Sequence, residues 1–214
     1  MMRLYTYFRS SAVFRVRIAL NLKGIAYEAL PVHFQRGGGE HRRPEFLQAN
    51  PQGLLPVLDD DGTILTQSLA IVEYLDSRYL EPRLIPADPI ERARVQALAQ
   101  IIACETHPLN NLRVLQYLRK ELRLDEAGVK RWAQHWIAES FRAFEAWVVQ
   151  WSGGLYCFGD TVSLADVCLV PQVYNARRFE CDLAPYPTIV RIADGLRDLP
   201  AFALAAPESQ PDAE

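Results

Sequence analysis

Hydrophobic and polar residues follow two different periods along this chain. In the first 80 residues, short apolar runs of strand character alternate with segments whose apolar residues recur at helical spacing. After residue 89 only the helical spacing continues. The pattern therefore predicts a small domain of mixed helices and strands, followed by a domain made of helices alone.

The first part has the order strand, helix, strand, short helix, strand, strand, helix. The predicted strands cover 3–7, 26–32 and a hairpin at 56–66, and the predicted helices cover 11–22, 42–49 and 68–79. Because a helix joins the first two strands, we expect them to be parallel, with a right-handed crossover. An Asp-Gly turn closes the hairpin. This order is that of an α/β thioredoxin-like sheet.

The second part follows a linker that contains three prolines. Its predicted helices cover 90–122, 125–151, 163–179 and 186–199, with Pro108 as a kink or break in the first. We assign the domains as 1–80 (thioredoxin-like), 81–89 (linker), 90–206 (all-α) and 207–214 (a polar, flexible tail).

Composition excludes several classes of function. The 214 residues have a net charge of −3 and no dominant basic stripe, which argues against a nucleic-acid partner. The four cysteines have no metal-site spacing, so we expect no metal. We see no signal-like N-terminal segment and no apolar run long enough to span a membrane, so we expect a cytoplasmic protein without membrane contact.

Two serines stand where the first strand meets the first helix. Ser10 and Ser11 fit the simple interpretation of a helix N-cap. The same position suits chemistry, because a helix N-terminus carries partial positive charge and lowers the pKa of a thiol placed there. A serine hydroxyl there can donate a hydrogen bond to the thiolate.

Six stretches resemble the glutathione transferase superfamily over essentially the whole chain, and within it the zeta class of maleylacetoacetate isomerases and bacterial maleylpyruvate isomerases. They are "YFRSSAVFRVRIALNLKGIAYE", "NPQGLLPVLDDDG", "LTQSLAIVEYLD", "HPLNNLRVLQYL", "FGDTVSLADVCLVPQVYNARRF" and "DLAPYPTI". The resemblance implies glutathione as cofactor, a homodimer, and Ser10 as the thiolate contact with Ser11 as its neighbour or substitute. One residue departs from the class: Ala12 stands where the motif usually has Cys, or Thr in some members.

The resemblance also implies a set of glutathione-binding residues. Leu55-Pro56 matches a cis-proline turn, whose Leu55 backbone groups pair with an extended peptide in the manner of an added strand; the alternative is a plain edge proline. Gln67 and Ser68 open a helix and match the site of the γ-glutamyl end, although an N-cap alone would also explain them. His41 matches a position near the glycyl end, although a solvated loop histidine would also explain it, and Gln52 lies close by.

A second set of candidate residues would bind the carboxylates of a substrate. Arginine is the residue best suited to bind a carboxylate with two hydrogen bonds, and Arg9 precedes the serines. Resemblance to the maleylpyruvate branch adds Arg177, His107, Asn111 and Arg113; the first interpretation of each is a helix surface or a domain contact. We expect His107 and Asn111 to share one helix face. Arg15 and Arg17 are interpreted as structural, and Asp166 as part of a capping box.

The predicted function is glutathione-dependent cis–trans isomerisation of maleylacetoacetate or maleylpyruvate, a small dicarboxylic keto acid, to the fumaryl product. Arg9, Ser10 and Ser11 are the predicted catalytic residues. The alternatives are a general glutathione transferase and a non-catalytic binding protein of the same fold, which Ala12 keeps open. The residues do not choose between the substrate of tyrosine catabolism, a route of aromatic amino acid breakdown, and the one derived from gentisate.

Overall fold

The computed structural model describes all 214 residues, Met1–Glu214, and divides them into two compact units. One unit consists of Met1–Arg83 together with Asp198–Glu214, and the other consists of Leu84–Arg197. No helix in the structure combines the length and the apolar character that crossing a membrane requires.

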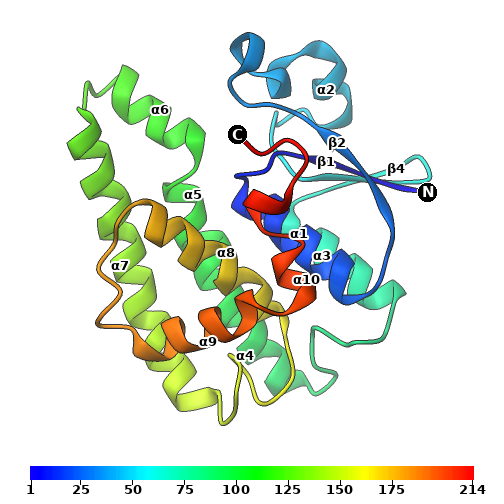
Figure 1. Ribbon diagram of the computed structural model, residues 1–214, viewed down its shortest axis with the longest axis vertical. Helices are drawn as coiled ribbons and strands as arrows, with labels where there is room; N and C mark the ends of the chain where they lie inside the picture. The colour runs from blue at the N-terminus through cyan, green and yellow to red at the C-terminus, as the bar shows by residue number, and fades with distance from the viewer. The chain divides into compact units, whose positions relative to one another are not determined.

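The first unit is built on a four-stranded mixed sheet in the order β2-β1-β3-β4 (Figure 1). Its strands are β1 (Met2–Thr6), β2 (Tyr27–Pro31), β3 (Val57–Asp60) and β4 (Thr63–Thr66). Its helices are α1 (Ser11–Leu22), α2 (Pro44–Ala49), α3 (Ser68–Arg78) and α10 (Pro200–Ala203), with short 3₁₀ turns at Arg36–Gly38, Glu40–Arg42 and Pro207–Ser209. β1 pairs in parallel with β2 and antiparallel with β3, so the predicted thioredoxin-like sheet is confirmed.

Alternating burial explains how the sheet is covered. Met2, Leu4 and Thr6 of β1 are buried, as the period of two along a strand requires. α1 contributes a buried run from Ala12 to Leu20, and it packs against α3. The predicted hairpin is also confirmed: Asp61 and Gly62 both have positive φ, the geometry of a type I′ turn.

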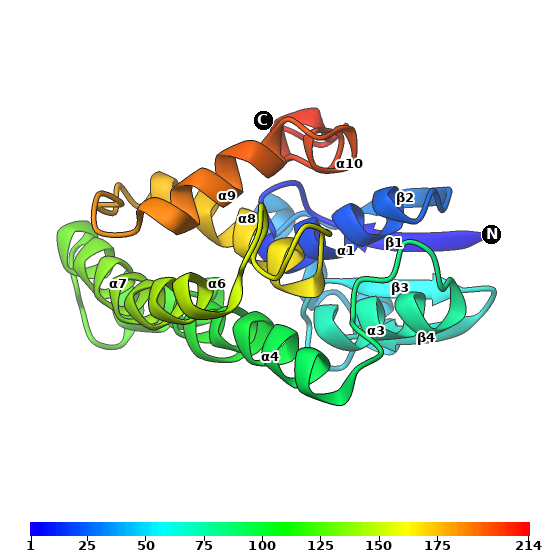
Figure 2. The same cartoon turned by 90° about the horizontal axis from the view of Figure 1, so that it is seen from below.

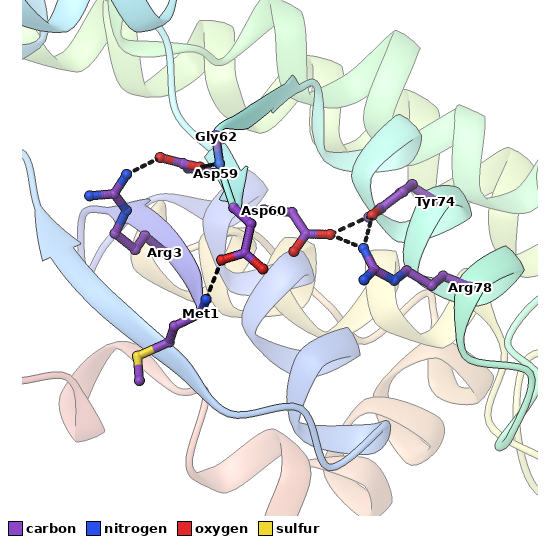
Figure 3. A network of polar contacts seen from close by, with 8 residues as sticks. Met1, Arg3, Asp59, Asp60, Gly62, Tyr74 and Arg78 are labelled. Atoms are coloured by element: carbon purple, nitrogen blue, oxygen red, sulfur yellow. Dashed lines mark hydrogen bonds and ion pairs between the residues drawn. The ribbon is translucent and has the colours of Figure 1, made fainter.

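Two of the three consecutive aspartates at this hairpin, Asp59 and Asp60, bind structural partners (Figure 3). Asp59 pairs with Arg3 and accepts a hydrogen bond from the Gly62 N–H at 2.7 Å. Asp60 accepts from Tyr74 and pairs with Arg78 of α3. These carboxylates therefore tie the hairpin to β1 and to α3, and we assign them no catalytic role.

The last residues of the chain belong to the first unit, which differs from the expected boundaries of 90–206 and 207–214. α10 packs on α1, and Figure 1 draws the red C-terminal segment beside the blue start of the chain. The difference has a physical reason that no hydrophobic pattern reveals. Arg17, buried in α1, donates to the C=O of Ala205, and Asn21 donates to the C=O of Ala201.

The second unit consists of helices, as predicted. They are α4 (Pro89–Gln100), the π-helix η3 (Ile101–Thr106), α5 (His107–Leu109), α6 (Leu112–Lys120), α7 (Glu126–Trp151), α8 (Leu164–Arg178) and α9 (Pro187–Arg197). α8 is central and largely buried, with α9 on one side and α4 on the other (Figure 2). The buried carboxylate of Asp166 accepts from the N–H groups of Ser163 and Cys157, which confirms its structural role at the start of α8.

The segment around Pro108 departs from a regular helix on both sides. Because proline has no N–H, the ordinary i→i−4 bond is missing there. Before Pro108 the backbone widens into a π-helix, in which the His107 N–H donates to the C=O of Ile102. After it, Asn110 and Asn111 leave the helical conformation, and α6 starts anew. The predicted break is confirmed, but the predicted shared face of His107 and Asn111 is wrong, because the two residues lie on either side of it.

Candidate functional site

The loop between β1 and α1 presents the two serines at the start of a helix. Ser10 is the N-cap of α1, and its Oγ accepts a hydrogen bond from the Val13 N–H at 3.3 Å. Its own N–H donates to the C=O of Tyr7 at 3.0 Å. Ser11 is the first residue of the helix. Of the two serines, the structure therefore gives the capping role to Ser10.

Capping leaves Ser10 able to do chemistry. A hydroxyl has one donor and two acceptor sites, and the contact with Val13 uses an acceptor site alone. The hydroxyl hydrogen remains available to an anion in front of the helix N-terminus, where backbone donors and the helix dipole already favour negative charge. Ala12, on the first turn, is 7% exposed and offers no polar group. Side-chain hydrogen bonding from this turn therefore depends on the serines.

Arg9 lies on the same loop and is exposed. Its guanidinium lies over the ring of Phe8, 4.9 Å from the centroid, and donates to the hydroxyl of Tyr7 at 3.2 Å. Both partners are uncharged, so the positive charge of Arg9 is not neutralised by this contact. The group suits a carboxylate ligand beside the serines.

Two glutamines far apart in sequence meet in the first unit. The Nε2 of Gln67 donates to the Oε1 of Gln52 at 2.8 Å. Gln67 has φ 68°, a left-handed conformation that is uncommon for a residue with a side chain and that often marks functional positions. The turn that carries Gln52 is organised by buried Asn50, which donates to the C=O of Leu54 and accepts from the Gln52 N–H. Sequence reasoning missed Asn50, although "NPQG" is a typical Asx-turn sequence.

Ser68 begins α3 directly after Gln67 and is buried. The guanidinium of Arg15, itself only 1% exposed, donates to the Ser68 Oγ at 3.2 Å. The Ser68 hydroxyl thus accepts from a buried cation, and its own hydrogen can be donated to another group. A cation behind a hydroxyl at a helix N-terminus suits a carboxylate. The structural interpretation of Arg15 therefore extends to support of this predicted site residue.

The peptide bond between Leu55 and Pro56 is cis, as the family resemblance implies. β3 starts at Val57, immediately after it, and Leu55 itself is buried. The turn places the Leu55 backbone ahead of the first ladder pair of β3 with β1, Tyr5 with Val57. An extended peptide can pair with a backbone in this position, in the manner of strand addition.

His41 is buried rather than solvated. It is 8% exposed, its ring packs edge-on against Phe34 at 4.7 Å, and its Nδ1 has no hydrogen-bond partner within the chain. Burial, and then the charge of Arg42, lower the pKa of His41. The preceding glycine makes this packing possible: at Gly39, with φ 104°, a Cβ would lie 2.6 Å from the His41 Cε1. The neutral ring can offer a hydrogen bond to a ligand.

The candidate anchors of the second unit lie on short helices around the break. His107 opens α5, and Asn111 caps α6 through its Oδ1, which accepts from the N–H of Arg113 at 3.2 Å. The amide oxygen of Asn111 is therefore already used by the backbone. Arg113 is exposed.

Arg177, at the end of α8, pairs with Asp194 of α9 at 2.8 Å. Both side chains are 40% exposed, so the pair contributes little to stability and can be exchanged for another carboxylate. The next residue, Arg178, donates instead to the Oδ1 of Asn175 at 2.9 Å and lies over the ring of Phe179.

Two buried amides in the second unit were missed by sequence reasoning. Gln172 in α8 has no exposed surface, and neither its Oε1 nor its Nε2 has a partner within the chain. The Oδ1 of Asn110, next to the helix break, is in the same situation. Buried polar atoms without partners cost free energy, so they often mark places where a bound polar molecule completes the hydrogen bonds. The apolar surroundings of Gln172 gave no signal, whereas Asn110 lies within the quoted stretch "HPLNNLRVLQYL".

Comparison with protein families matches both halves of the chain. Residues 4–83 match "Glutathione S-transferase, N-terminal domain", and residues 130–203 match "Glutathione S-transferase, C-terminal domain". A "Probable maleylacetoacetate isomerase" of Vibrio cholerae is 54% identical over 98% of this chain and 97% of its own length. A "Maleylpyruvate isomerase" of a Ralstonia species is 50% identical, with 99% of both chains covered.

Solved structures of isomerases with these two names are also similar to this chain. The holo structure of a maleyl pyruvate isomerase, described as a bacterial glutathione S-transferase in the zeta class, is 48% identical with a TM-score of 0.96 and covers 99% of this chain and 100% of its own. A maleylacetoacetate isomerase of Methylobacterium extorquens with bound malonate and GSH is 41% identical, with a TM-score of 0.91 and 99% of both chains covered.

Proposed function

Because the chain belongs to the glutathione S-transferase family, and within it to the zeta class, we propose that it is a glutathione-dependent cis–trans isomerase. Its substrate is maleylacetoacetate or maleylpyruvate, and its product is the fumaryl isomer. One observation carries this proposal: the chain is about equally similar, over nearly its full length, to relatives named for each of these two activities.

The residues of the first unit fit glutathione. The cis turn at Leu55-Pro56 offers backbone groups to an extended peptide, and Ser68 offers a hydroxyl backed by Arg15 to a carboxylate. Gln67, Gln52 and His41 supply further hydrogen-bonding groups. In this proposal Gln67 and Ser68 bind the γ-glutamyl end, and His41 lies toward the glycyl end.

When bound, glutathione would supply a nucleophilic thiolate for reversible addition to the activated double bond, which permits rotation about that bond. The chain's task is to keep the sulfur ionised and in position. Ser10 donates its hydroxyl hydrogen to the sulfur, with Ser11 beside it, and the N-terminus of α1 adds its partial positive charge. No strong protein acid or base is required.

Cationic side chains hold the carboxylates of the substrate. Arg9 lies beside the serines with its charge not neutralised by Phe8 or Tyr7, and it also stabilises the negative charge that develops on the keto group. Arg177, His107, Asn111 and Arg113 are the proposed contributors from the second unit. Arg177 would exchange Asp194 for a substrate carboxylate.

The test is a direct assay of the purified protein on maleylacetoacetate and on maleylpyruvate, with and without glutathione. We expect turnover of at least one substrate that depends on glutathione but does not consume it. Consumption of glutathione on small electrophiles, with no isomerisation, would assign the protein as a general transferase. Failure to bind immobilised glutathione would favour the non-catalytic alternative that Ala12 left open.

Two further features belong to the same proposal. We expect the protein to be a homodimer, which gel filtration of the purified protein tests directly. We also expect it in the cytoplasm, where glutathione is kept reduced.

A further inference from the structure

Arg17 connects two distant parts of the first unit. Its guanidinium is completely buried, with no exposed surface. On one side, Nε donates to the C=O of Ala205 at 2.9 Å. On the other, Nη1 donates to the Oγ1 of Thr6 at 3.1 Å and Nη2 donates to the C=O of Phe8 at 3.0 Å. One side chain thus joins the C-terminal segment to the end of β1 and the loop that follows it.

A second contact reaches the same loop from the same segment. The Oδ2 of Asp212 accepts a hydrogen bond from the N–H of Phe8 at 3.0 Å. Phe8 is therefore held at both of its backbone polar groups, its C=O by Arg17 and its N–H by Asp212. Two residues further along the chain is Ser10.

The hydrogen-bond partners of Arg17 are all uncharged. A buried guanidinium bonded only to carbonyl and hydroxyl oxygens is costly, and burial lowers the pKa of Arg17 to about 10. The group stays charged at neutral pH, and the carboxylate of Asp212 favours that charge. A neutral, well-packed side chain would stabilise α1 at least as well as this buried charge, so stability alone does not explain Arg17. A guanidinium is planar and has several N–H donors, so it can fix several carbonyl groups at once.

We propose that the segment Asp198–Glu214 is a positioning element for the loop between β1 and α1, acting through Arg17 and Asp212 to hold Phe8 and thereby the direction in which Ser10 presents its hydroxyl. Arg17 and Asp212 are positioning residues, since neither reaches the Ser10 side chain. The inference rests on the proposed function for the role of Ser10, but the contacts themselves do not depend on it.

Two variants of Asp212 separate the hydrogen bond from the charge. Asp212→Ala removes the acceptor for the Phe8 N–H, whereas Asp212→Asn keeps an acceptor oxygen in place. Glu214→Gln is the matched control: it lies in the same segment and loses the same charge, but its partners are His33 and Arg36 in the loop after β2. Arg17→Lys keeps a positive charge and loses the planar guanidinium with its several N–H donors.

The first measurement is amide hydrogen exchange of the β1–α1 loop in the full-length protein without glutathione. We expect Asp212→Ala to speed exchange at Phe8 and its neighbours about tenfold, and Asp212→Asn and Glu214→Gln to leave it near wild type. Unchanged exchange in both Asp212→Ala and Arg17→Lys would overturn the inference, whatever the enzyme assays show.

The second measurement is the pH profile of kcat in the isomerase assay. If the loop loses its orientation, the glutathione thiolate loses the hydrogen bond from Ser10, and the pKa of the thiol rises. We therefore expect Asp212→Ala and Arg17→Lys to lower kcat several-fold and to move the pH profile of kcat to higher pH. The KM for glutathione should change less, because Gln67 and Ser68 are untouched. An altered loop with an unaltered pH profile would overturn the positioning role. Absence of isomerisation in the wild-type protein would instead refute the proposed function and leave the exchange result intact.

Discussion

The candidate residues of the first unit are joined to one another, whereas those of the second unit lie around a break in the backbone. Gln52 bonds to Gln67, and Arg15 bonds to Ser68. In the second unit, His107 and Asn111 stand on opposite sides of the disrupted turn after a π-helix, and Arg177 is engaged by an exposed carboxylate. The first arrangement is organised before any ligand binds, and the second must exchange partners.

The two arrangements suit different parts of the proposed function. A cofactor that is the same in every turnover is best met by side chains already fixed in place, because little ordering is left to oppose binding. Anchors with exchangeable partners suit a substrate that enters, changes shape and leaves. Single substitutions in each unit test this contrast, beginning with the one that should change the rate most.

Removing the Ser10 hydroxyl should have the greatest effect on the rate. We expect Ser10→Ala to lower kcat about a hundredfold, because one preorganised donor to a developing or stable anion is lost. Its loss as the α1 cap should also lower the free energy of unfolding by about 1 kcal/mol. Steady-state kinetics across pH and urea unfolding measure the two effects separately. Ser11→Ala is the matched control, and an equal loss of rate in both variants would refute the primary role of Ser10.

Breaking the glutamine pair tests the organisation of the first unit. We expect Gln52→Ala and Gln67→Asn each to raise the KM for glutathione about tenfold, with the two effects coupled by about 1 kcal/mol in a double-mutant cycle. Asparagine is chosen at position 67 because it tolerates the left-handed backbone found there. Strictly additive effects would show that the hydrogen bond between the two side chains does not matter for binding.

Substitutions of Arg177 and of its partner Asp194 test whether Arg177 exchanges this partner for a substrate carboxylate. We expect Arg177→Gln to raise the KM for the substrate several-fold, and Asp194→Asn to lower it, because the competing carboxylate is gone. Arg178→Gln is the matched control on the next residue. A larger rise in Arg178→Gln than in Arg177→Gln would transfer the anchor role by one position along α8.

Replacing the buried amide of α8 tests whether a polar molecule completes its hydrogen bonds. Gln172→Leu keeps a similar volume and removes two polar atoms that have no partner within the chain. If those atoms are unpaired in solution, the free energy of unfolding should rise by about 1 kcal/mol. Thermal and urea unfolding measure it. A loss of stability would contradict this expectation and indicate a bound water at the amide.

The pH dependence due to His41 should be the weakest of these effects. Burial lowers the pKa of this ring in the folded protein, so below about pH 6.5 the unfolded chain binds the proton more readily. The free energy of unfolding should therefore fall as the pH decreases through that range, and His41→Gln should reduce the fall. Urea unfolding at a series of pH values provides the measurement. His135→Gln, at an exposed histidine, is the control; if it had the same effect, His41 would not be responsible.

Local patterns were sufficient to predict much of the first unit. Strand alternation in β1, the Asp-Gly turn and the helical spacing after Ser10 each depend on residues close together in sequence, and all three appear in the structure. The cis turn at Leu55-Pro56 was predicted from resemblance to the family. The contact between Gln52 and Gln67 could not be predicted, because it depends on how two turns meet in space.

In the second unit, the spacing of apolar residues did not predict where the helices are interrupted. Apolar spacing continues through residues 90–122, so it could not reveal that the backbone forms a π-helix before Pro108 and leaves the helical conformation after it. Because Asn110 and Asn111 leave the helical conformation, His107 and Asn111 belong to two different helices and do not share one face. The partner of Arg177 was equally hidden, since Asp194 lies on a different helix.

Because Asp198–Glu214 belong to the first unit, that unit is assembled from the two ends of the chain, which are synthesised at different times. A ribosome adds about 5–20 residues per second, and domains generally fold as they emerge. Here the residues of β1 and α1 emerge before Ala205 and Asp212, which accept hydrogen bonds from Arg17 and from the Phe8 N–H. Throughout the translation of the helical unit, Arg17 lacks the acceptor at Ala205, although all four strands of the sheet have already been made. The loop that carries Ser10 thus gains its hydrogen bond to Asp212 only after residue 212 has been made.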